Sequence, residues 1–418
     1  MDRRAVLSLL GAGIGALGGC STSGESDADP GLSETGTETR PETETTRERL
    51  DTIYVDDSNG AAGNLGTSDD PLDSIQGAFE RARPGQTVYV RPGVYQEYVS
   101  PPRGGAPGAP ITITGPPEAI LRNDPDRYGM LAVRHSHIKV TGLTFDGLSD
   151  PGAPQDADSY TEGEPIIVRP HTDTSDYLQN IVLAPHRIGN SQKGLINIDR
   201  TMNASVGPFT VTGIAGAEYL LTGQRGHIGE IVYLGTAPSN LGTDWHPWTE
   251  YDQTRNVRVH HVDNSAGHPH AELVNTKLGT HDITVEYCTD GGGSQIQEEY
   301  PAASLRLGSY RTTVRWCDLR DGMGDGIVIG APHAKGARQN TAYPSETIRL
   351  AATNNRIFGN RISGFDGDPI VFPNVHDWDD QDLICGNFDP ESPVENVTRD
   401  CEKDVPTGIG IGHTGGAP

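Results

Sequence analysis

The chain has 418 residues, including 53 Gly and 30 Pro, a mean hydropathy of −0.49 and a formal net charge of −25. A chain this acidic lacks the basic footprint that nucleic-acid binding requires, so no nucleic-acid partner is expected. Apolar residues with helical spacing are almost absent. Short β-branched runs between Gly, Pro, Asn and Asp favour a repeat of short strands over a doubly wound sheet.

The charge balance is skewed as well as acidic, with five Lys against 27 Arg. Many surface carboxylates keep a protein hydrated in high salt, and this pattern is typical of haloarchaeal proteins. An acidic polysaccharide partner is compatible with such a surface, because molar salt shortens the Debye length to about 3 Å and leaves only local charges to act.

Residues 1–20, MDRRAVLSLLGAGIGALGGC, have a charged start with twin arginines, a short apolar stretch and a lipobox-like LGGC. They resemble the Tat lipoprotein signals of prokaryotes, which implies that Cys20 carries a lipid and becomes the mature N-terminus. An ordinary secretory peptide cut near Cys20 is the alternative. Both predict export, and the first predicts a protein held at the outer face of the cell membrane by its lipid alone.

Residues 21–50 are Ser, Thr, Glu, Asp, Gly and Pro with scarcely an apolar side chain. Such a segment cannot bury enough surface to offset its chain entropy, so a disordered acidic tether is predicted.

The next segment begins with the only convincing amphipathic helix, marked by Leu72, Ile75 and Phe79, and continues into the strand TVYVRPGVY. Residues 51–99 resemble the N-terminal cap of right-handed parallel β-helix proteins of the pectin-lyase-like class. GAPGAPITITG and HIKVTGLTFDG match later elements of the same pattern. The resemblance implies an all-β fold over residues 51–375: a single-stranded right-handed parallel β-helix with a short N-terminal capping helix.

An internal repeat supports stacked coils: KLGTHDITVEYC (277–288) aligns without a gap on RLGSYRTTVRWC (306–317). Equivalent residues of successive coils form columns at the strand spacing of about 4.8 Å. The alignment predicts Lys277 over Arg306, and Tyr233 over Asn275 and Ser304. The two-residue period of a strand then turns Asn275, Lys277 and Arg306 outward.

Cysteines beyond Cys20 fall into two pairs. Cys288 and Cys317 share one column in adjacent coils, where two buried thiols and a disulfide are both open interpretations. Cys385 and Cys401 bracket a loop-like acidic stretch in the C-terminal segment 376–418, and a disulfide between them is predicted because export permits disulfides.

Two short motifs, ELVNTK and SLRLG, resemble the site of the chondroitinase B and alginate lyase family of polysaccharide lyases, which cleave uronate polymers on a parallel β-helix. The resemblance implies that Lys277 is the catalytic base and that Arg306 acts at the leaving group. β-Elimination needs such a set, because the weakly acidic C5 proton must be removed while the neighbouring carboxylate is neutralised. The charge of Arg306 would lower the pKa of Lys277 and so make it a usable base.

In that family acidic residues and an asparagine hold a calcium ion. Here Glu272 and Asn275 match the motif, whereas the first acidic position is occupied by His270, a poor calcium ligand. A calcium site would therefore have to draw on Glu230 from the coil below. His270 is expected to contact substrate instead, together with Asn275.

Further substrate contacts are expected around this site. His281 or Tyr310 could move the proton that arginine donates poorly. Trp245 and Trp248, in the inserted loop TDWHPWTEY, could stack on sugar rings or pack the loop onto the coil beneath it; both interpretations are open.

The sequence thus predicts an exported, monomeric polysaccharide lyase acting on an acidic polysaccharide, with Ca²⁺ as a candidate cofactor. The alternatives are a glycoside hydrolase or uronate epimerase, centred on carboxylates such as Asp321 and Asp325, and a non-catalytic surface protein that binds glycan or mediates adhesion. Fold alone does not choose among them.

Overall fold

The computed structural model describes residues 50–152, 156–222, 228–269, 271–291, 302–330, 352–373 and 378–388. The chain divides into two compact units, Met1–Glu48 and Arg49–Pro418, and all described residues belong to the second. The predicted signal segment with Cys20 and the predicted tether up to residue 49 lie outside the described residues. None of the described helices is long and apolar enough to cross a membrane.

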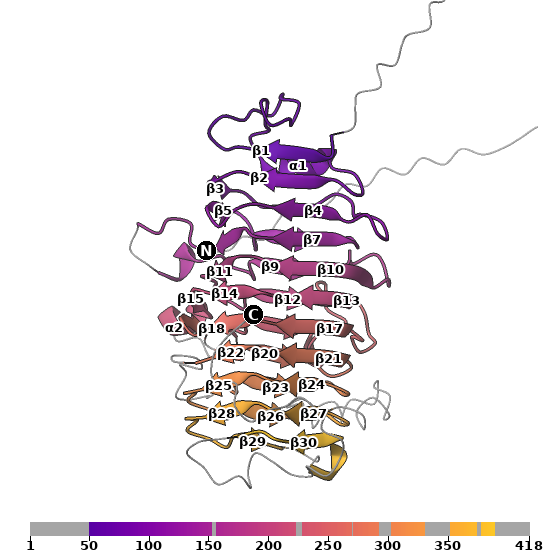
Figure 1. Cartoon of the computed structure of the whole chain (residues 1–418), viewed down its shortest axis with the longest axis vertical. Coiled ribbons are helices and arrows are strands. Elements are labelled where there is room, and N and C mark those ends of the chain that lie inside the picture. Colours follow the sequence, from indigo (N-terminus) through magenta and orange to yellow (C-terminus); the bar gives the residue numbers. More distant parts are fainter. Residues whose placement is uncertain are drawn as a thin grey trace, which may run out of the picture. The chain divides into compact units, whose positions relative to one another are not determined.

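Three parallel sheets, named A, B and C, make up the domain (Figure 1). Sheet A contains β1 (Thr52–Val55), β2 (Thr87–Val90), β4 (Ile111–Thr114), β7 (Ile138–Thr141), β10 (Leu178–Ala184), β13 (Thr201–Val206), β17 (Arg255–His260), β21 (His281–Glu286), β24 (Thr313–Arg315), β27 (Arg356–Phe358) and β30 (Leu383–Cys385). Sheet B contains β3 (Gly93–Gln96), β5 (Ala119–Arg122), β8 (Thr144–Asp146), β11 (Arg187–Gly189), β14 (Phe209–Val211), β18 (Val262–Asn264), β22 (Thr289–Asp290), β25 (Asp318–Arg320) and β28 (Arg361–Ser363). Sheet C contains β6 (Leu131–Val133), β9 (Ile166–Val168), β12 (Ile196–Ile198), β16 (Val232–Leu234), β20 (Val274–Thr276), β23 (Leu305–Leu307), β26 (Ile327–Ile329) and β29 (Ile370–Val371).

From β4 to β29, each turn of the solenoid supplies one strand to sheet A, one to sheet B and one to sheet C, in that order. Every strand pairs in parallel with its equivalent in the next turn, as a coiled chain requires. The predicted all-β fold, a right-handed parallel β-helix, is therefore confirmed. A separate parallel pair, β15 (Gly213–Ala215) with β19 (Gly267–Pro269), lies outside the three sheets.

The predicted capping helix is present as α1 (Ile75–Arg81). Ser74 caps it: its Oγ accepts a hydrogen bond from Gly77 N at 3.1 Å. The Glu97 carboxylate accepts from the Ile75 N–H at the same end of the helix. Ile75 and Phe79 are fully buried against the first strands. A second short helix, α2 (Ala217–Thr222), and three 3₁₀ turns, Ala157–Ser159, Pro238–Asn240 and Trp378–Asp380, complete the helical elements of the described chain.

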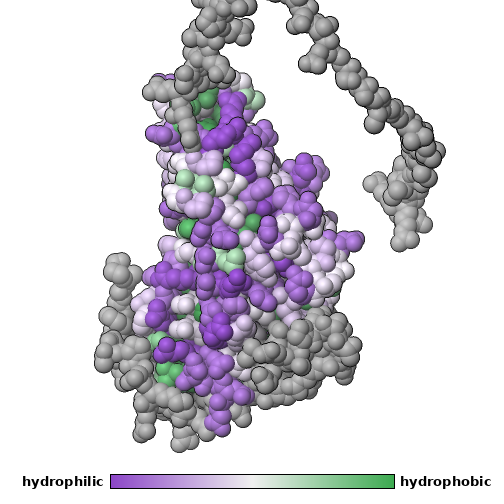
Figure 2. All heavy atoms as spheres, turned by 90° about the vertical axis from the view of Figure 1, so that its right-hand side faces the viewer, coloured by the Kyte–Doolittle hydropathy of each residue, from purple (hydrophilic) through white to green (hydrophobic). Residues whose placement is uncertain are grey.

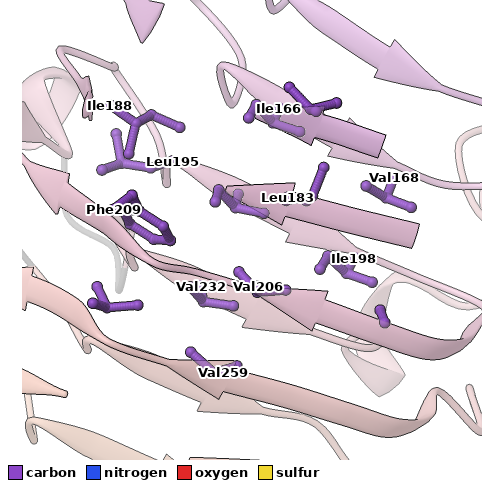
Figure 3. Close-up of a cluster of buried hydrophobic side chains, with 14 of the residues drawn as sticks. Ile166, Val168, Leu183, Ile188, Leu195, Ile198, Val206, Phe209, Val232 and Val259 are labelled. Carbon is purple, nitrogen blue, oxygen red and sulfur yellow. The ribbon is translucent and has the colours of Figure 1, made fainter. Parts of the chain in front are cut away.

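The interior is a continuous column of aliphatic side chains contributed by all three sheets (Figure 3). Ile166 and Val168 of β9 point into it beside Leu183, whereas Ile167 between them is not part of the core. Each fully buried side chain of this kind contributes about 1.5–3 kcal/mol. The face of the domain in Figure 2 is mostly hydrophilic, as the acidic composition predicts.

A column of residues with positive φ shapes the entry into sheet A. Asn203 (φ 58°) and Asn256 (φ 52°) occupy equivalent places in adjacent coils, and the Asn256 amide donates to Asn203 Oδ1 at 3.2 Å. Asp282 (φ 54°) and Arg311 (φ 53°) continue the column. Asn and Asp tolerate the left-handed region better than other non-glycine residues, and they form the bend in three of these four coils.

The predicted register is correct in sheet A and shifted in sheet C. Thr284 of β21 pairs with Thr313 of β24, which is the spacing of the ungapped alignment. In sheet C, however, Asn275 pairs with Arg306 rather than with Ser304. The turn after β20 holds four residues, 277–280, whereas the turn after β23 holds only 308–309 before the bridge of Tyr310 to His281. The extra length shifts the strands by two residues and keeps their inward and outward faces.

The solenoid continues beyond the predicted boundary at residue 375, because β30 extends sheet A to Cys385. Cys385 is disulfide-bonded, but Cys401 lies outside the described residues, so the predicted bridge between them stays a prediction. Cys288 and Cys317 are both buried and free, which favours the interpretation as two thiols.

Candidate functional site

The candidate site lies on the outer face of sheet C. This face is formed by the middle residue of each strand and by the outward residues next to the strands. Paired middle residues run through successive coils in the order Ala132, Ile167, Asn197, Tyr233, Asn275, Arg306 and Val328. Their flanking residues, such as Val274, Leu305 and Leu307, belong to the core, so the predicted outward orientation of Asn275 and Arg306 is correct.

Lys277 follows β20 directly, and its backbone N–H donates to Leu234 O at 2.9 Å in the coil below. Its Nζ lies 4.2 Å from the centre of the Tyr233 ring. The Cβ that Gly235 lacks would sit 3.5 Å from Lys277 Cβ, so Gly235 lies beneath the lysine. Burial, and secondarily the charge of Arg306, lowers the pKa of Lys277, although Glu230 and Glu272 act in the opposite direction.

Arg306 and Glu272 form a buried ion pair between adjacent coils. Arg306 Nε donates to Glu272 Oε1 at 2.6 Å, and the carboxylate is fully shielded from solvent. Burial works against the charge of Glu272, but Arg306 and Lys277 outweigh it and hold the pKa of Glu272 below its usual value. The predicted stacking of Lys277 on Arg306 is corrected: the arginine lies beside Asn275 and bonds to Glu272.

Asn275 links the two acidic residues. Its Nδ2 donates to Glu272 Oε2 at 3.1 Å and to Glu230 Oε1 at 3.4 Å. Its Oδ1 is buried and accepts no hydrogen bond from the residues that the structure describes. A buried acceptor without a partner costs about 1–3 kcal/mol, so this atom is suited to receive a donor from a bound ligand.

Glu230 has the opposite electrostatic behaviour from Glu272. Burial raises its pKa to about 7, and the neighbouring Glu272 adds to the shift, while Lys277 opposes it. The pKa of Glu230 is raised and that of Lys277 is lowered, so both shifts favour placing one proton on the carboxyl group and leaving the amine neutral.

These side chains do not fit a calcium ion well. Glu272 is bonded to a guanidinium group, and Asn275 turns N–H donors, rather than its oxygen, toward both carboxylates. Ca²⁺ takes six to eight oxygen ligands. No group of three or more His, Cys, Asp or Glu side chains is placed to hold a metal within the described residues. We derive no step through a metal, and calcium binding stays a prediction.

Two of the predicted substrate contacts form a cluster of their own. The rings of His281 and Tyr310 lie 4.9 Å apart, and His281 Nδ1 is 2.7 Å from Asp282 Oδ2. Arg311 donates to both oxygens of Asp282. Burial lowers the pKa of His281 although Asp282 opposes the shift. The structure thus brings His281 and Tyr310 to Asp282 and Arg311 rather than to Lys277.

The two tryptophans of the inserted loop behave differently. Trp248 is buried, its Nε1 donates to Thr174 O at 2.8 Å, and the Arg200 guanidinium lies 4.7 Å above its ring. Trp248 therefore packs the loop onto the coil, the second of the two interpretations. Trp245 is exposed and stacks on Tyr128, with ring centres 6.0 Å apart. His270 lies outside the described residues.

The alternative carboxylates have roles in turns. Asp325 Oδ1 accepts the Asp368 N–H at 3.0 Å, and its backbone oxygen accepts from Ser304. Asp321 has a φ of 58° and donates its N–H to Ser363 O. Both residues have the bonding expected of tight coil turns.

Sequence reasoning missed three residues near the site. Tyr233, against the Lys277 amine, was placed in the correct column but given no role; its outward position next to Asn275 was the available signal. Tyr128 meets both Lys193 and Trp245 across more than fifty residues of chain. No local pattern predicts contacts of this range.

No family model and no curated protein matches the chain. Among solved structures, an alginate lyase from Paenibacillus sp. str. FPU-7 is similar with a TM-score of 0.57 at 15% identity, covering 76% of this chain and 93% of that one. These similarities show the fold. A GH136 lacto-N-biosidase from Eubacterium ramulus (TM-score 0.46, 11% identity, 81% and 63% coverage) and pectate lyase Pel9A (0.47, 9%, 78% and 78%) are more distant.

Proposed function

We propose that the domain binds an acidic, uronate-containing polysaccharide on the outer face of sheet C and cleaves it by β-elimination. The observation that carries the proposal is Lys277: its amine rests on Tyr233, its pKa is lowered by burial, and a cation and an unpaired acceptor lie within the same group of side chains. The alginate lyase noted above supports the proposal through its fold only.

Neutral Lys277 would remove the C5 proton of the uronate. Transfer of the Lys277 proton to Glu230 would give the amine a free lone pair without a change in the total charge of the site, and both pKa shifts act in that direction. Arg306 would offset the negative charge that develops on the substrate carboxylate. It uses Nε for Glu272, and a guanidinium carries four further N–H donors.

Asn275 and Tyr233 would orient the sugar. The unpaired Asn275 Oδ1 can accept from a hydroxyl group, while its Nδ2 stays fixed by the two carboxylates. Tyr233 presents a partly exposed ring beside the base. Protonated Glu230 could return a proton to the departing glycosidic oxygen, a role that a carboxyl group of pKa about 7 fills better than an arginine.

A second function, hydrolysis by a glycosidase, is favoured by the same carboxyl pair. Glu230 with a raised pKa and Glu272 with a lowered one are the acid and the carboxylate that such enzymes use. In this case Glu230 and Glu272 replace Asp321 and Asp325 as the central residues. Uronate epimerisation and non-catalytic glycan binding remain alternatives on the same surface.

The deciding experiment offers pectate, alginate, chondroitin, heparan and ulvan to the purified protein in high salt, with and without calcium. Elimination produces unsaturated uronate ends that absorb in the ultraviolet, whereas hydrolysis produces reducing ends without that absorbance. We expect absorbance and reducing ends to rise together on at least one polymer. Reducing ends alone would establish the hydrolase, and neither signal would leave a binding protein.

The predicted export signal and lipid at Cys20 fit this function, and we propose them with it. A polymer too large to enter the cell must be degraded outside it, and an acidic tether would keep the domain clear of the membrane to which the lipid attaches. Mass spectrometry of the mature N-terminus from the native host would show diacylglycerol on Cys20; an unmodified terminus would refute the anchor.

A further inference from the structure

The outer face of sheet C presents partly exposed polar side chains in three successive coils. Tyr233, Lys277 and Arg306 are partly exposed, whereas the outward residues of the preceding coils are covered and Asn197 is only 9% exposed. On the other side, the outward Val328 of β26 is buried as well. The described face is thus covered toward the N-terminal coils, whereas toward the C-terminal coils the outward Val371 of β29 is again partly exposed.

Two aromatic side chains account for the closure at the N-terminal side. Tyr128 comes from the segment before β6, and its ring lies against Gly163, whose missing Cβ would sit 2.4 Å from Tyr128 Cε1. Gly163 precedes β9, and Gly129, the residue after Tyr128, lies beside the outward Ile167 of β9, since its missing Cβ would sit 3.4 Å from Ile167 Cδ1. The tyrosine therefore lies at the entry to β9, where Ile167 is buried beneath the coil surface.

Trp245 completes this cover from the opposite side. It belongs to the loop after β16, and it stacks on Tyr128 at an interplanar angle of 26° while remaining 65% exposed. Lys193, which precedes β12, places its Nζ 5.4 Å from the centre of the Tyr128 ring. We call Tyr128 and Trp245 the aromatic bridge; it joins segments that enter and leave sheet C and crosses the face between them.

We infer that the site takes the end of a glycan chain rather than its middle, so that the protein is an exolytic enzyme. The inference rests on the proposed function, since it concerns how the polymer meets Lys277. A chain lying along the face would meet the aromatic bridge on the N-terminal side of Tyr233, so it would reach Lys277 with the end that faces the bridge. At about 4.8 Å for each coil, only a few sugars fit between the bridge and Arg306.

Product length and polymer viscosity test the inference. Purified protein is incubated with a viscous uronate polymer that it cleaves, and unsaturated ends, viscosity and product size are followed together. We expect mono- to trisaccharides from the earliest time points, with viscosity falling slowly for each end produced. Long oligosaccharides at early times, with a rapid loss of viscosity, would overturn the inference while leaving β-elimination established.

Variants of the bridge make the test specific. Trp245→Ala and Tyr128→Ala are expected to raise the viscosity loss per bond cleaved several-fold and to lengthen the products. The matched control is Tyr287→Ala, another exposed and stacked aromatic, which lies at the end of β21 away from sheet C and should leave the product pattern unchanged. A bridge variant that keeps the wild-type product pattern would count against the inference.

A binding measurement separates this inference from the proposed chemistry. If no polymer is cleaved, oligouronates of increasing length are titrated against the tryptophan fluorescence of the protein. Affinity that stops rising at a trisaccharide supports a short site closed at the bridge even when the proposed elimination has failed. Affinity that keeps rising with every added sugar would overturn the closed site.

Discussion

Two glutamates of this solenoid, Glu286 and Glu272, each lie near two cations, but their surroundings give them different properties. On sheet A, Glu286 lies between Arg258 and Arg315 in the coils below and above, bonded to both. On sheet C, Glu272 lies beside Arg306 and near Lys277. The first set is a ladder whose cations reach water, with Arg258 47% and Arg315 32% exposed, whereas Arg306 is 16% exposed.

The difference shows why charge pattern alone does not identify a site. Opposite charges in adjacent coils stabilise any parallel stack, and the sheet A ladder serves that purpose. On sheet C the same pattern carries an amine of lowered pKa, a carboxyl group with a pKa of about 7 and an unpaired acceptor, Asn275 Oδ1. Burial of the cations, and not their number, separates the candidate site from the ladder.

The strongest test of the comparison between the two sets removes one cation from each. Lys277→Ala is expected to lower kcat on the responsive polymer by at least about 100-fold, because it deletes the proposed base. Arg315→Ala, which removes a cation from the ladder, should leave kcat within about twofold of wild type. Initial rates of ultraviolet absorbance in high salt provide the measurement. Equal losses in both variants would mean that Lys277 acts only through the stability of the coil.

The two glutamates should also differ in what they contribute to folding. Glu272→Gln leaves Arg306 without its anion in a nearly buried place, which is expected to cost about 3 kcal/mol. Glu286→Gln leaves two arginines that water can solvate, and about 1 kcal/mol is expected. Urea unfolding in matched buffers measures both. A larger loss at Glu286 than at Glu272 would reverse the assignment of the buried and the solvated set.

How well the sequence predicts these two environments depends on how far apart along the chain the contacting residues lie. The repeat KLGTHDITVEYC over RLGSYRTTVRWC correctly predicts the coil and the sheet A register, because β-branched runs and the bend residues Asp282 and Arg311 recur at one spacing. It misplaces Arg306 by two residues in sheet C, since the turn after β20 contains two more residues than the turn after β23. An alignment without gaps hides this difference in turn length, because similar residues align across the turn.

The group around Lys277 was predictable in part for a similar reason. Glu230, Glu272, Asn275 and Lys277 lie in or beside strands, where the two-residue period fixes the outward face. The contact of Trp245 with Tyr128 depends on a loop that crosses several coils, and no local spacing encodes it. The stacking role of Trp245 and the packing role of Trp248 became distinct only with the loop in place.

The pH dependence of activity offers a finer comparison. The charge of Glu230 raises the pKa of Lys277, so Glu230→Gln should lower that pKa and move the rise of kcat/KM toward lower pH. Glu286→Gln should leave the profile in place, because Glu286 acts on Arg258 and Arg315. Profiles of wild type and both variants would be recorded on one polymer. Complete loss of activity in Glu230→Gln would show that the proposed return of a proton from Glu230 is essential, and the effect on the pKa of Lys277 would then be read from binding instead.

Salt provides the smallest expected effect. Arg258→Ala removes one exposed cation of the ladder and should cost about 0.5 kcal/mol in dilute buffer. The loss should fade at molar salt, where the Debye length shrinks to about 3 Å. Arg306→Ala should remain destabilising in both buffers, because it leaves Glu272 buried without its 2.6 Å partner and salt ions cannot reach it. Urea midpoints at low and molar salt give the four values. A salt-sensitive loss at Arg306 would show that ions do reach Glu272, and the contrast between the two glutamates would then be one of degree.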